Sequence, residues 1–467
     1  MTPDQFRQHG REVVDWIADY YEQIESSPVM ARVAPGDVRA ALPAHPPERG
    51  EPFAGVLADL DRAVLPGITH WQHPGFFGYF PANASFPAIL GDLLSAGLGV
   101  QGMLWATSPA ATELETLTLD WLAELLDLPA AFRSVGPGGG VIQDTASSAV
   151  LVALVAALHR ASGGASGRAG VTQRYTVYAS QAAHSSLEKA VRLTGIGTDN
   201  LRLVDVDPGT QSLRIEHLQE LLSADQAAGA TPVLVLATAG TTSTTAFDPV
   251  AGIGPVCREA GAWLHVDGAY AGVAAVCPEL RWVNDGLDFA DSYSTNPHKW
   301  LLTNFDCDAF YVADRTALVG ALSILPEYLR NAASESGAVI DYRDWQVPLG
   351  RRFRALKLWC VLRWYGADGL RAHIRSHVQL AQEFARWVGD DERFEIVAPH
   401  PLSLVCFRLR GADEPNEKLL ARLNAGGEVF LTHTRVNGAY ALRLAVGSPA
   451  TQQRHVERAW QLIREPA

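Results

Sequence analysis

The stretch Ser292-Tyr293-Ser294-Thr295-Asn296-Pro297-His298-Lys299-Trp300 contains a short strand-like run that ends at an Asn-Pro turn, with a single lysine after the turn. Lysine is rarely buried unless it is paired or has reacted. In apolar surroundings the pKa of its amine falls, and the neutral amine becomes a nucleophile toward carbonyl groups. The alternative is a surface lysine whose stem lies along Trp300. The neighbouring segments distinguish a buried, nucleophilic lysine from a surface lysine.

Apolar strand candidates and helical segments alternate around this stretch. Helices are expected between most of the strands, at 185–195, 215–228 and 249–260, and the strand candidates are 175–180, 201–206, 233–238, 263–267, 290–295 and 308–313. Near-continuous apolar strands joined by helices predict an α/β fold with a mostly parallel sheet covered on both faces. Ligands bind such sheets at strand ends. The polar residues expected there are His184, Thr241, Thr242, Asp267, Asn296 and Lys299.

Asp267 ends one of these strands and is followed by Gly268-Ala269-Tyr270. A carboxylate flanked by small residues at a strand end is well placed to meet a flat ligand, although an aspartate in a turn or cap has the same surroundings. Its position one strand before Lys299 favours the functional interpretation. The pair suggests a lysine that forms a Schiff base with pyridoxal phosphate and an acid that meets the ring nitrogen.

A glycine run, Gly136-Pro137-Gly138-Gly139-Gly140, leads through Asp144 to Thr145-Ala146-Ser147 and an apolar helix that ends near His159. Glycines and hydroxyl residues at a helix start favour an anion such as phosphate, because free N–H groups and the helix dipole point at it. An ordinary capped helix begins in the same way. The run lacks the lysine motif of nucleotide triphosphatases.

Two further segments have unusual composition. Residues 66–87 alternate aromatics with Gly and Pro, which suits either the wall of an apolar pocket or a hydrophobic loop packed on the core. Residues 326–348 form a long polar loop with Tyr328 near its start. That tyrosine is either an exposed loop residue or a general acid carried on a lid.

The two ends of the chain predict separate elements. Thr2-Pro3-Asp4-Gln5 forms a helix start, and the helix that follows has an apolar stripe that packs either on its own subunit or on a second one. An extended connector is expected at 28–55. Helices at 355–365, 368–388 and 451–464 with strands at 403–409 and 439–446 predict a small α+β domain.

Composition narrows the class of protein. The 467 residues are 48% hydrophobic and 19% charged, with a net charge of −13. The chain has no basic stripe, so nucleic acid is not expected as a partner. The five cysteines, at 257, 277, 307, 360 and 406, are scattered without a metal-type pair. They suit reduced thiols in a cytoplasmic protein. The chain has no apolar run of about 18 residues, so no membrane span is expected.

Taken together, these motifs resemble the pyridoxal phosphate-dependent aromatic L-amino acid decarboxylases, within the group II amino acid decarboxylases. The resemblance runs from the Phe6 helix to Trp460. It rests on the segments 66–71 (PGITHW), 182–186 (AAHSS), 265–270 (HVDGAY), 296–300 (NPHKW) and 348–353 (PLGRRF). It implies a fold type I enzyme that binds pyridoxal 5'-phosphate and works as a homodimer. The implied parts are an N-terminal dimer-forming segment at 1–81, a cofactor-binding domain at 82–356 and a C-terminal domain at 357–467.

The resemblance also implies roles for individual residues. Lys299 looks like the Schiff-base lysine, Asp267 like the partner of the ring nitrogen and His184 like the histidine on the ring face. Ala269 is similar to the small residue on the ring, and Thr242 to a residue near the cofactor hydroxyl and the substrate. Tyr328 matches the loop tyrosine that protonates the substrate carbon after decarboxylation. The phosphate set is Thr145, Ala146, Ser147, Asn296 and His298, and the aromatic substrate wall is Trp71, Tyr79, Phe80 and Pro81.

Several positions differ from the animal enzymes of that family. Ala82 stands in place of a threonine, Met103 in place of an aromatic that reaches in from the partner subunit, and Gln101 and Asp144 in place of an apolar residue and a glycine. Gly350 leaves room for a large ring. An aromatic substrate is therefore expected, with tryptophan- and phenylalanine-type side chains ranking no lower than DOPA.

Three alternatives stay open. The aldehyde-forming relatives often have phenylalanine where this chain has Tyr328, so plain decarboxylation is favoured over an aromatic aldehyde synthase. A decarboxylase of glutamate or another non-aromatic amino acid conflicts with the aromatic stretch at 71–80. A cofactor-free binding protein conflicts with the intact set of Lys299, Asp267 and His184.

Overall fold

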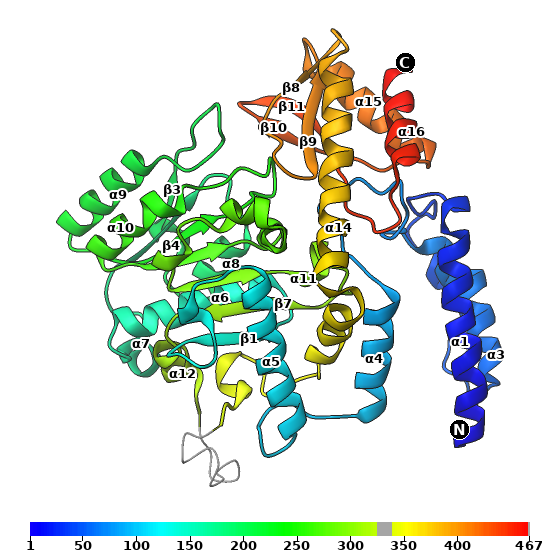
Figure 1. The fold of residues 1–467 in the computed structure, drawn as a ribbon, viewed down its shortest axis with the longest axis horizontal. Coiled ribbons are helices and arrows are strands. Elements are labelled where there is room, and N and C mark those ends of the chain that lie inside the picture. Colours follow the sequence, from blue (N-terminus) through cyan, green and yellow to red (C-terminus); the bar gives the residue numbers. More distant parts are fainter. Residues whose placement is uncertain (325–338, 466–467) are drawn as a thin grey trace.

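The computed structural model describes residues 1–324 and 339–465, and it contains two β-sheets of unequal size (Figure 1). The larger sheet has seven strands in the order β1-β7-β6-β5-β4-β2-β3. The strands are β1 (Gly139–Gln143), β2 (Tyr175–Ser180), β3 (Leu201–Val204), β4 (Thr231–Thr238), β5 (Trp263–Asp267), β6 (Ser292–Thr295) and β7 (Asp308–Val312). Only β7 runs antiparallel to its neighbours, which are β1 and β6. The expected α/β architecture is confirmed.

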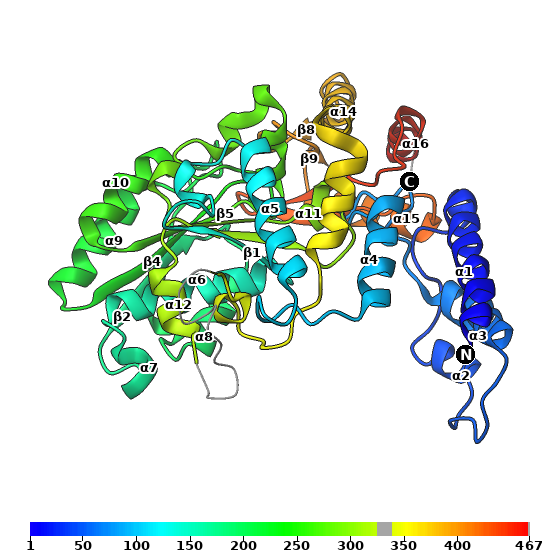
Figure 2. The ribbon, with the colours of Figure 1, turned by 60° about the horizontal axis from the view of Figure 1, so that its bottom comes forward.

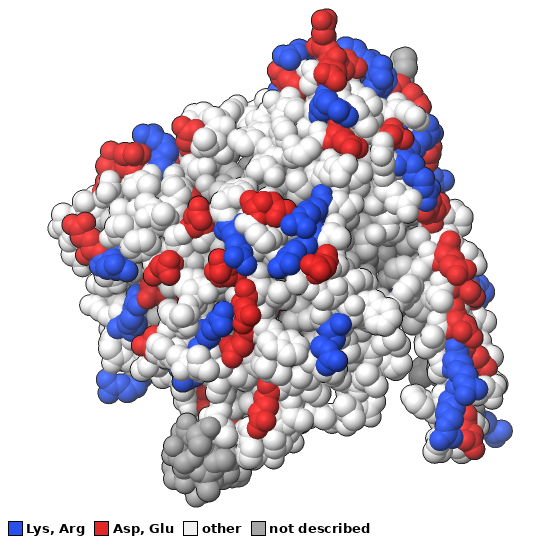
Figure 3. All heavy atoms as spheres, viewed as in Figure 1, with Lys and Arg blue, Asp and Glu red and all other residues white. Residues whose placement is uncertain are grey.

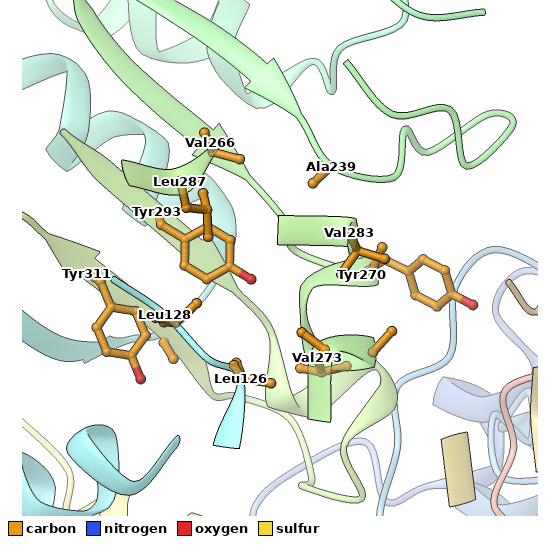
Figure 4. Close-up of a cluster of buried hydrophobic side chains, with 14 of the residues drawn as sticks. Leu126, Leu128, Ala239, Val266, Tyr270, Val273, Val283, Leu287, Tyr293 and Tyr311 are labelled. Carbon is orange, nitrogen blue, oxygen red and sulfur yellow. The ribbon is translucent and has the colours of Figure 1, made fainter. Parts of the chain in front are cut away.

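Helices cover both faces of this sheet, because each strand is apolar on both sides. One face packs on α6 (Ala146–Ala161), α8 (Ser186–Leu193) and α12 (Thr316–Leu322). The other packs on α5 (Pro109–Leu125), α9 (Ile215–Ala227) and α10 (Val250–Ala260). Figure 4 shows part of this second core, where Val266, Tyr293 and Tyr311 project from neighbouring strands. Alternate residues of β7 therefore face opposite layers, as in any pleated strand.

Strand β1 corrects one expectation from the sequence. The glycine run at 136–140 was expected to form the anion-binding loop. It leads into β1 instead, and its glycines allow close packing against neighbouring segments. A Cβ on Gly138 would lie 2.0 Å from the Val312 carbonyl oxygen, and one on Gly140 would lie 2.7 Å from the Tyr311 ring. Glycine is required because β1 and the segment before it approach their neighbours too closely for a side chain. The candidate anion site that remains is at the other end of β1, where α6 begins.

The smaller sheet is antiparallel and has the order β10-β11-β9-β8. Its strands are β8 (Phe394–Ile396), β9 (Leu404–Leu409), β10 (Thr432–Val436) and β11 (Ala439–Ala445), and α15 (Asp413–Gly426) and α16 (Gln453–Arg464) pack on it. Helix α14 (Ala355–Gly389) joins the two sheets (Figure 1). It is broken at Gly366, where φ is 60° and ψ is 179°, so two helices occur there as the sequence predicts.

The N-terminal helix α1 (Pro3–Gln23) begins with the expected capping box, in which the Thr2 and Gln5 side chains each meet the other's backbone N–H. None of its residues is buried. Both ribbon views show α1 beside α3 (Phe53–Asp59) and at the edge of the molecule (Figures 1 and 2). The expected connector at 28–55 includes the short helix α2 (Asp37–Ala41) and the start of α3. Helix α4 (Phe86–Leu98) follows, and α7 (Ala165–Ala169) lies between α6 and β2.

Candidate active site

A cavity of about 210 Å³ lies where β4, β5 and β6 end and α6 begins. Eleven of the residues expected from the sequence line it, so the structure brings together segments that are far apart in the chain. They are Phe80, Thr145, Ala146, Ser147, His184, Thr242, Asp267, Ala269, Asn296, His298 and Lys299. This is the strand-end position at which parallel sheets bind ligands.

Lys299 lies on the single-turn helix α11 (Pro297–Trp300), which begins where β6 ends. Its backbone N–H donates to the Asn296 carbonyl oxygen at 2.9 Å. Burial lowers the pKa of the Lys299 amine, and the nearby carboxylates of Asp267 and Asp308 counter part of that effect. A larger fraction of the amine is therefore neutral and nucleophilic than for a lysine in water.

Asp267 ends β5 between Thr238 of β4 and Ser294 of β6, which are its partners in the sheet register. The side chain is buried, and its Oδ1 accepts a hydrogen bond from the Ala269 N–H at 2.9 Å. That bond fixes the direction of the carboxyl group and places the small residue Ala269 next to it. The hydroxyl groups of Thr238 and Ser294 are buried without a hydrogen-bond partner among the described residues. Such groups are expected where a polar ligand binds.

His184 lies between β2 and α8, and its ring lines the cavity. Its Nδ1 accepts a hydrogen bond from the Ser186 N–H at 3.2 Å, so the proton of the neutral ring is on Nε2. Burial lowers the pKa of His184, with Asp267 acting in the opposite direction. A neutral, flat ring held in this way is suited to lie against the face of an aromatic ligand.

The first turn of α6 is the candidate anion site. Thr145 is extended and precedes the helix, and the N–H groups of Ala146 and Ser147 belong to the first turn, where no intrahelical acceptor exists. Asp144 lies beside this turn, and its Oδ1 accepts from the Thr145 N–H at 2.7 Å. The extra negative charge expected from the sequence is therefore directed at the backbone of the same turn.

Asn296 and His298 complete this corner of the cavity. The Cys307 N–H donates to His298 Nδ1 at 2.9 Å, so Nε2 bears the proton of the neutral ring. Burial lowers the pKa of His298 to about 3, which keeps the ring neutral. Asn296 Nδ2 is placed 3.0 Å from His298 Nε2. Two N–H donors cannot face each other, so we assign the amide the reversed orientation, in which its oxygen accepts from Nε2. Its NH2 group is then free to donate to an anion.

The aromatic residues expected in the substrate wall divide into two groups. Phe80 lines the cavity and stacks on Tyr270 with ring centres 3.7 Å apart. Trp71 and Tyr79 stack on each other and are 38% and 52% exposed, outside this cavity. Pro81 packs against Gly447, and the Ala82 carbonyl oxygen accepts from the Gln72 side chain. The substrate roles of Trp71, Tyr79, Pro81 and Ala82 stay predictions.

Gln101 and Gly350 come together at a second place, and neither they nor Met103 line the cavity. The Gln101 side chain accepts from the Arg351 N–H at 2.6 Å, and a Cβ on Gly350 would lie 3.3 Å from the Gln101 amide nitrogen. Arg351 donates two hydrogen bonds to the buried carboxylate of Glu115, at 2.6 and 3.0 Å. The substrate roles of Met103 and Gly350 stay predictions. Tyr328 lies outside the described residues, so its role is also a prediction.

Four lining residues were not predicted from the sequence: Thr238, Gly240, Tyr270 and Phe305. Thr238 ends β4 as Asp267 ends β5, so the same strand-end rule could have found it. Tyr270 is the centre of an aromatic stack that also contains Phe80 and Trp300, whose ring is 4.8 Å from that of Tyr270. Figure 4 shows the Tyr270 ring directed away from Tyr293 and Tyr311. Phe305 gives no sequence signal.

The small sheet also reaches the cavity through Arg443 of β11. This buried guanidinium donates to the carbonyl oxygens of Thr242 and Ser243, at 2.7 and 2.9 Å, and lies over the Phe80 ring at 5.5 Å. The Tyr270 hydroxyl is hydrogen-bonded to Ser403, which precedes β9. Residues of the small sheet therefore hold two walls of the cavity in place.

The protein-family comparison matches residues 35–410 to the pyridoxal-dependent decarboxylase conserved domain. The chain belongs to the pyridoxal-dependent decarboxylase family. Its cofactor is pyridoxal 5'-phosphate, and the cavity contains the groups that this cofactor requires: a nucleophilic amine, a buried carboxylate, a flat neutral ring and an anion site. Among the described residues, no cluster of His, Cys, Asp or Glu could hold a metal ion, and no helix is long and apolar enough to cross a membrane.

Curated relatives of this decarboxylase cover nearly the whole chain. Phenylacetaldehyde synthase of Arabidopsis thaliana is 48% identical over all of this chain and 96% of its own length. Tryptophan decarboxylase 2 of Oryza sativa subsp. japonica is 45% identical, over all of this chain and 95% of its own length. The solved structure of Oryza sativa TDC with PLP and tryptamine has a TM-score of 0.97 at 45% identity, covering 99% of this chain and 98% of that one.

Proposed function

We propose that this protein decarboxylates aromatic L-amino acids to arylalkylamines and CO2. The observation that carries the proposal is the shared cavity of the Lys299 amine, the buried Asp267 carboxylate and the first turn of α6. Phe80 and Tyr270 give that cavity an aromatic wall. The relatives named for tryptophan decarboxylation and phenylacetaldehyde synthesis support an aromatic substrate.

Bound pyridoxal phosphate supplies the conjugated ring that accepts the electron pair left behind when CO2 departs. Asp267 keeps a proton on the ring nitrogen, because its fixed carboxylate favours the charged form. Lys299 would hold the cofactor through its amine. His184 would lie against the ring face, and the N–H groups of Ala146 and Ser147 would bind the phosphate. Tyr328 delivers the proton to the α-carbon of the substrate.

The second candidate is an aromatic aldehyde synthase on the same scaffold. The 48% identity to a phenylacetaldehyde synthase favours it, and Tyr328 opposes it, because the aldehyde-forming relatives often have phenylalanine there. The two activities share the residues of the cavity. They differ in the step after CO2 has left: the decarboxylase protonates the α-carbon and releases an amine, whereas the synthase yields an aldehyde with ammonia and peroxide. Only the products distinguish them.

A product assay on the purified holoenzyme tests the proposal. L-tryptophan, L-phenylalanine, L-tyrosine, L-DOPA and L-glutamate are supplied separately, and amine, aldehyde, CO2, ammonia and peroxide are quantified. We expect amine and CO2 in equal amounts from at least one aromatic substrate and none from glutamate. Aldehyde with ammonia and peroxide would establish the synthase, and fastest turnover of glutamate would remove the aromatic assignment. A protein without the visible absorbance of bound cofactor would instead be a binding protein.

We propose that the protein is a homodimer in which α1 and α4 pack on the partner. Five large apolar side chains of α4, all between 48% and 63% exposed, line one helix: Phe86, Leu90, Leu93, Leu94 and Leu98. Phe6 of α1 is 60% exposed. In Figure 3 the charged side chains of α1 form one stripe along the helix, and few charges lie on the neighbouring surface over α4. An uncovered apolar surface of this kind is typical of a subunit interface.

Light scattering on the purified protein measures its oligomeric state. We expect about twice the chain mass of 50.4 kDa for the wild type and monomers for the double variant L93K/L94K, because two ammonium groups cannot be buried in an apolar interface. Leu193→Lys is the matched control, since Leu193 is 66% exposed on α8 and should leave the mass unchanged. A monomeric wild type would contradict the proposal.

We also propose that the chain is divided into the segments 1–81, 82–356 and 357–467, and that the protein is cytoplasmic. The separate cores of the two sheets support the division, although Leu358 and Val361 of α14 still belong to the core of the large sheet. The five cysteines are all free thiols, which suits a reducing compartment.

A further inference from the structure

Asp308, the first residue of β7, is a buried acid to which the proposed reaction gives no role. Its side chain is fully buried, and neither carboxyl oxygen has a hydrogen-bond partner among the described residues. Nearly all buried polar groups in proteins are hydrogen-bonded, so such an acid requires an explanation.

The position of Asp308 is set by two neighbouring strands. It pairs with Gln143, the last residue of β1, and Asp144 and the α6 turn follow directly. Its side chain lies on the same face of β7 as Phe310 and Val312, which is the face packed on α6. The preceding residue, Cys307, donates to His298 of the anion site. Asp308 therefore lies beside the corner of the cavity where the phosphate is proposed to bind.

An ionised carboxylate would be unstable at this position, because burial removes its hydration and no hydrogen bond among the described residues compensates for that loss. Burial raises the pKa of Asp308 well above its ordinary value, Asp267 and Asp144 raise it further, and Lys299 lowers it. The only other titratable neighbour on α11 is His298, which is neutral. The first turn of α6 contributes only Ala146, Ser147 and Ser148. The surroundings therefore favour the protonated acid.

We propose that Asp308 is a proton-bearing acid of the phosphate site, and that its ionisation weakens the binding of the cofactor's phosphate group. The inference rests on the proposed binding of the phosphate at 145–147. A neutral acid can donate a hydrogen bond to a phosphate oxygen, whereas a carboxylate beside Asp144 would place a second negative charge against a dianion.

The sign of the pH dependence follows from linkage. The phosphate dianion favours the protonated form of Asp308, so its binding raises the pKa of this acid and retains a proton. Affinity for the phosphate group is then full below the pKa of the free site and declines as the pH rises through the interval between the two values. Lys299 responds to pH in the opposite sense, because its amine becomes more nucleophilic as the pH rises. A probe without phosphate separates the two effects.

The test measures the dissociation constants of pyridoxal phosphate and of pyridoxal for the full-length apoprotein, by tryptophan fluorescence. The ratio of the two constants isolates the phosphate group. Above about pH 7, where the phosphate remains a dianion, we expect the advantage of pyridoxal phosphate to fall with rising pH in the wild type. The fall should be about tenfold for each unit by which the bound phosphate raises the pKa of Asp308. Asp308→Asn, which is neutral at every pH, should hold the advantage constant. Asp308→Ser provides a second neutral variant if the first folds poorly.

Asp144→Asn is the matched control, because it removes the other carboxylate beside the same turn and leaves Asp308 able to ionise. Since Asp144 raises the pKa of Asp308, this variant should keep the loss of affinity with rising pH but begin it at a lower pH than the wild type. The proposal is overturned if the ratio in the wild type does not change with pH, if Asp308→Asn retains the change, or if only Asp144→Asn abolishes it. Equal affinity for both probes at every pH is a different result. It would show that 145–147 does not bind the phosphate, and the proposed site would fail with it.

Discussion

Replacing Lys299 with alanine should abolish covalent attachment of the cofactor and reduce turnover at least about 10⁴-fold, the loss expected when the group that forms a covalent bond is removed. The amine of Lys299 is neutralised in part by burial and lies in one cavity with Asp267 and His184. The chain contains four lysines in all: Lys189, Lys299, Lys357 and Lys418. The attachment can therefore be assigned to one of them without ambiguity.

Borohydride reduction followed by mass spectrometry of peptides gives the measurement. The wild type should carry one reduced cofactor on the peptide that contains Lys299, and Lys299→Ala should carry none. Lys418→Ala is the control, since that side chain is 72% exposed on α15 and pairs with Glu414 at the surface. Attachment at Lys189 or Lys357 in the wild type would show that the assignment of Lys299 is incorrect.

Replacing Asp267 with asparagine should lower turnover about 10²- to 10³-fold, the loss found when one preorganised electrostatic contact to a developing charge is removed. The asparagine keeps the shape and the oxygen that accepts from the Ala269 N–H, but it removes the negative charge. Without that charge the ring nitrogen loses its proton near neutral pH, and the ring accepts electrons less readily. Binding of the cofactor should weaken much less than turnover, because Lys299 and the α6 turn remain.

Two variants separate charge from structure at this position. Asp267→Glu keeps the charge and should retain more activity than Asp267→Asn, which keeps the shape but loses the charge. The charge argument fails if Asp267→Asn turns over substrate at the wild-type rate. It also fails if Asp267→Asn loses the cofactor entirely, since a lost fold would then explain the result.

Much of the large sheet could be predicted from the sequence because its strands are unbroken apolar runs. Residues 175–180 and 263–267 are strands with the predicted bounds. Strand β1 was missed because its glycines indicate a loop until the closeness of Val312 and Tyr311 is known. Strand β10 was missed because it is an edge strand with half-exposed polar residues. Both errors arise from tertiary packing, which a local pattern does not contain.

The candidate site also contains residues that could be predicted from the sequence and residues that could not. Lys299, Asp267 and His184 could be predicted because each lies at or just after the end of a strand and their residue types suit one cofactor. Asp308 could not, because its segment predicts a strand correctly and nothing in the sequence shows that its carboxyl group lacks a partner. Arg443 is separated from Thr242 by two hundred residues of chain. Contacts of that length become visible only in the folded protein.

The order of strands in the large sheet also determines when the anion site can exist. Strand β1 pairs only with β7, so residues 139–143 have no place in the sheet until residues 308–312 have been synthesised and have folded beside β6. The turn at 144–147 depends on β1 for its position. Pairing between such distant segments is slow, because a long loop must be closed first. The proposed phosphate site can therefore form only after residue 312 has been synthesised, so the cofactor stabilises a later stage of folding without guiding an early one.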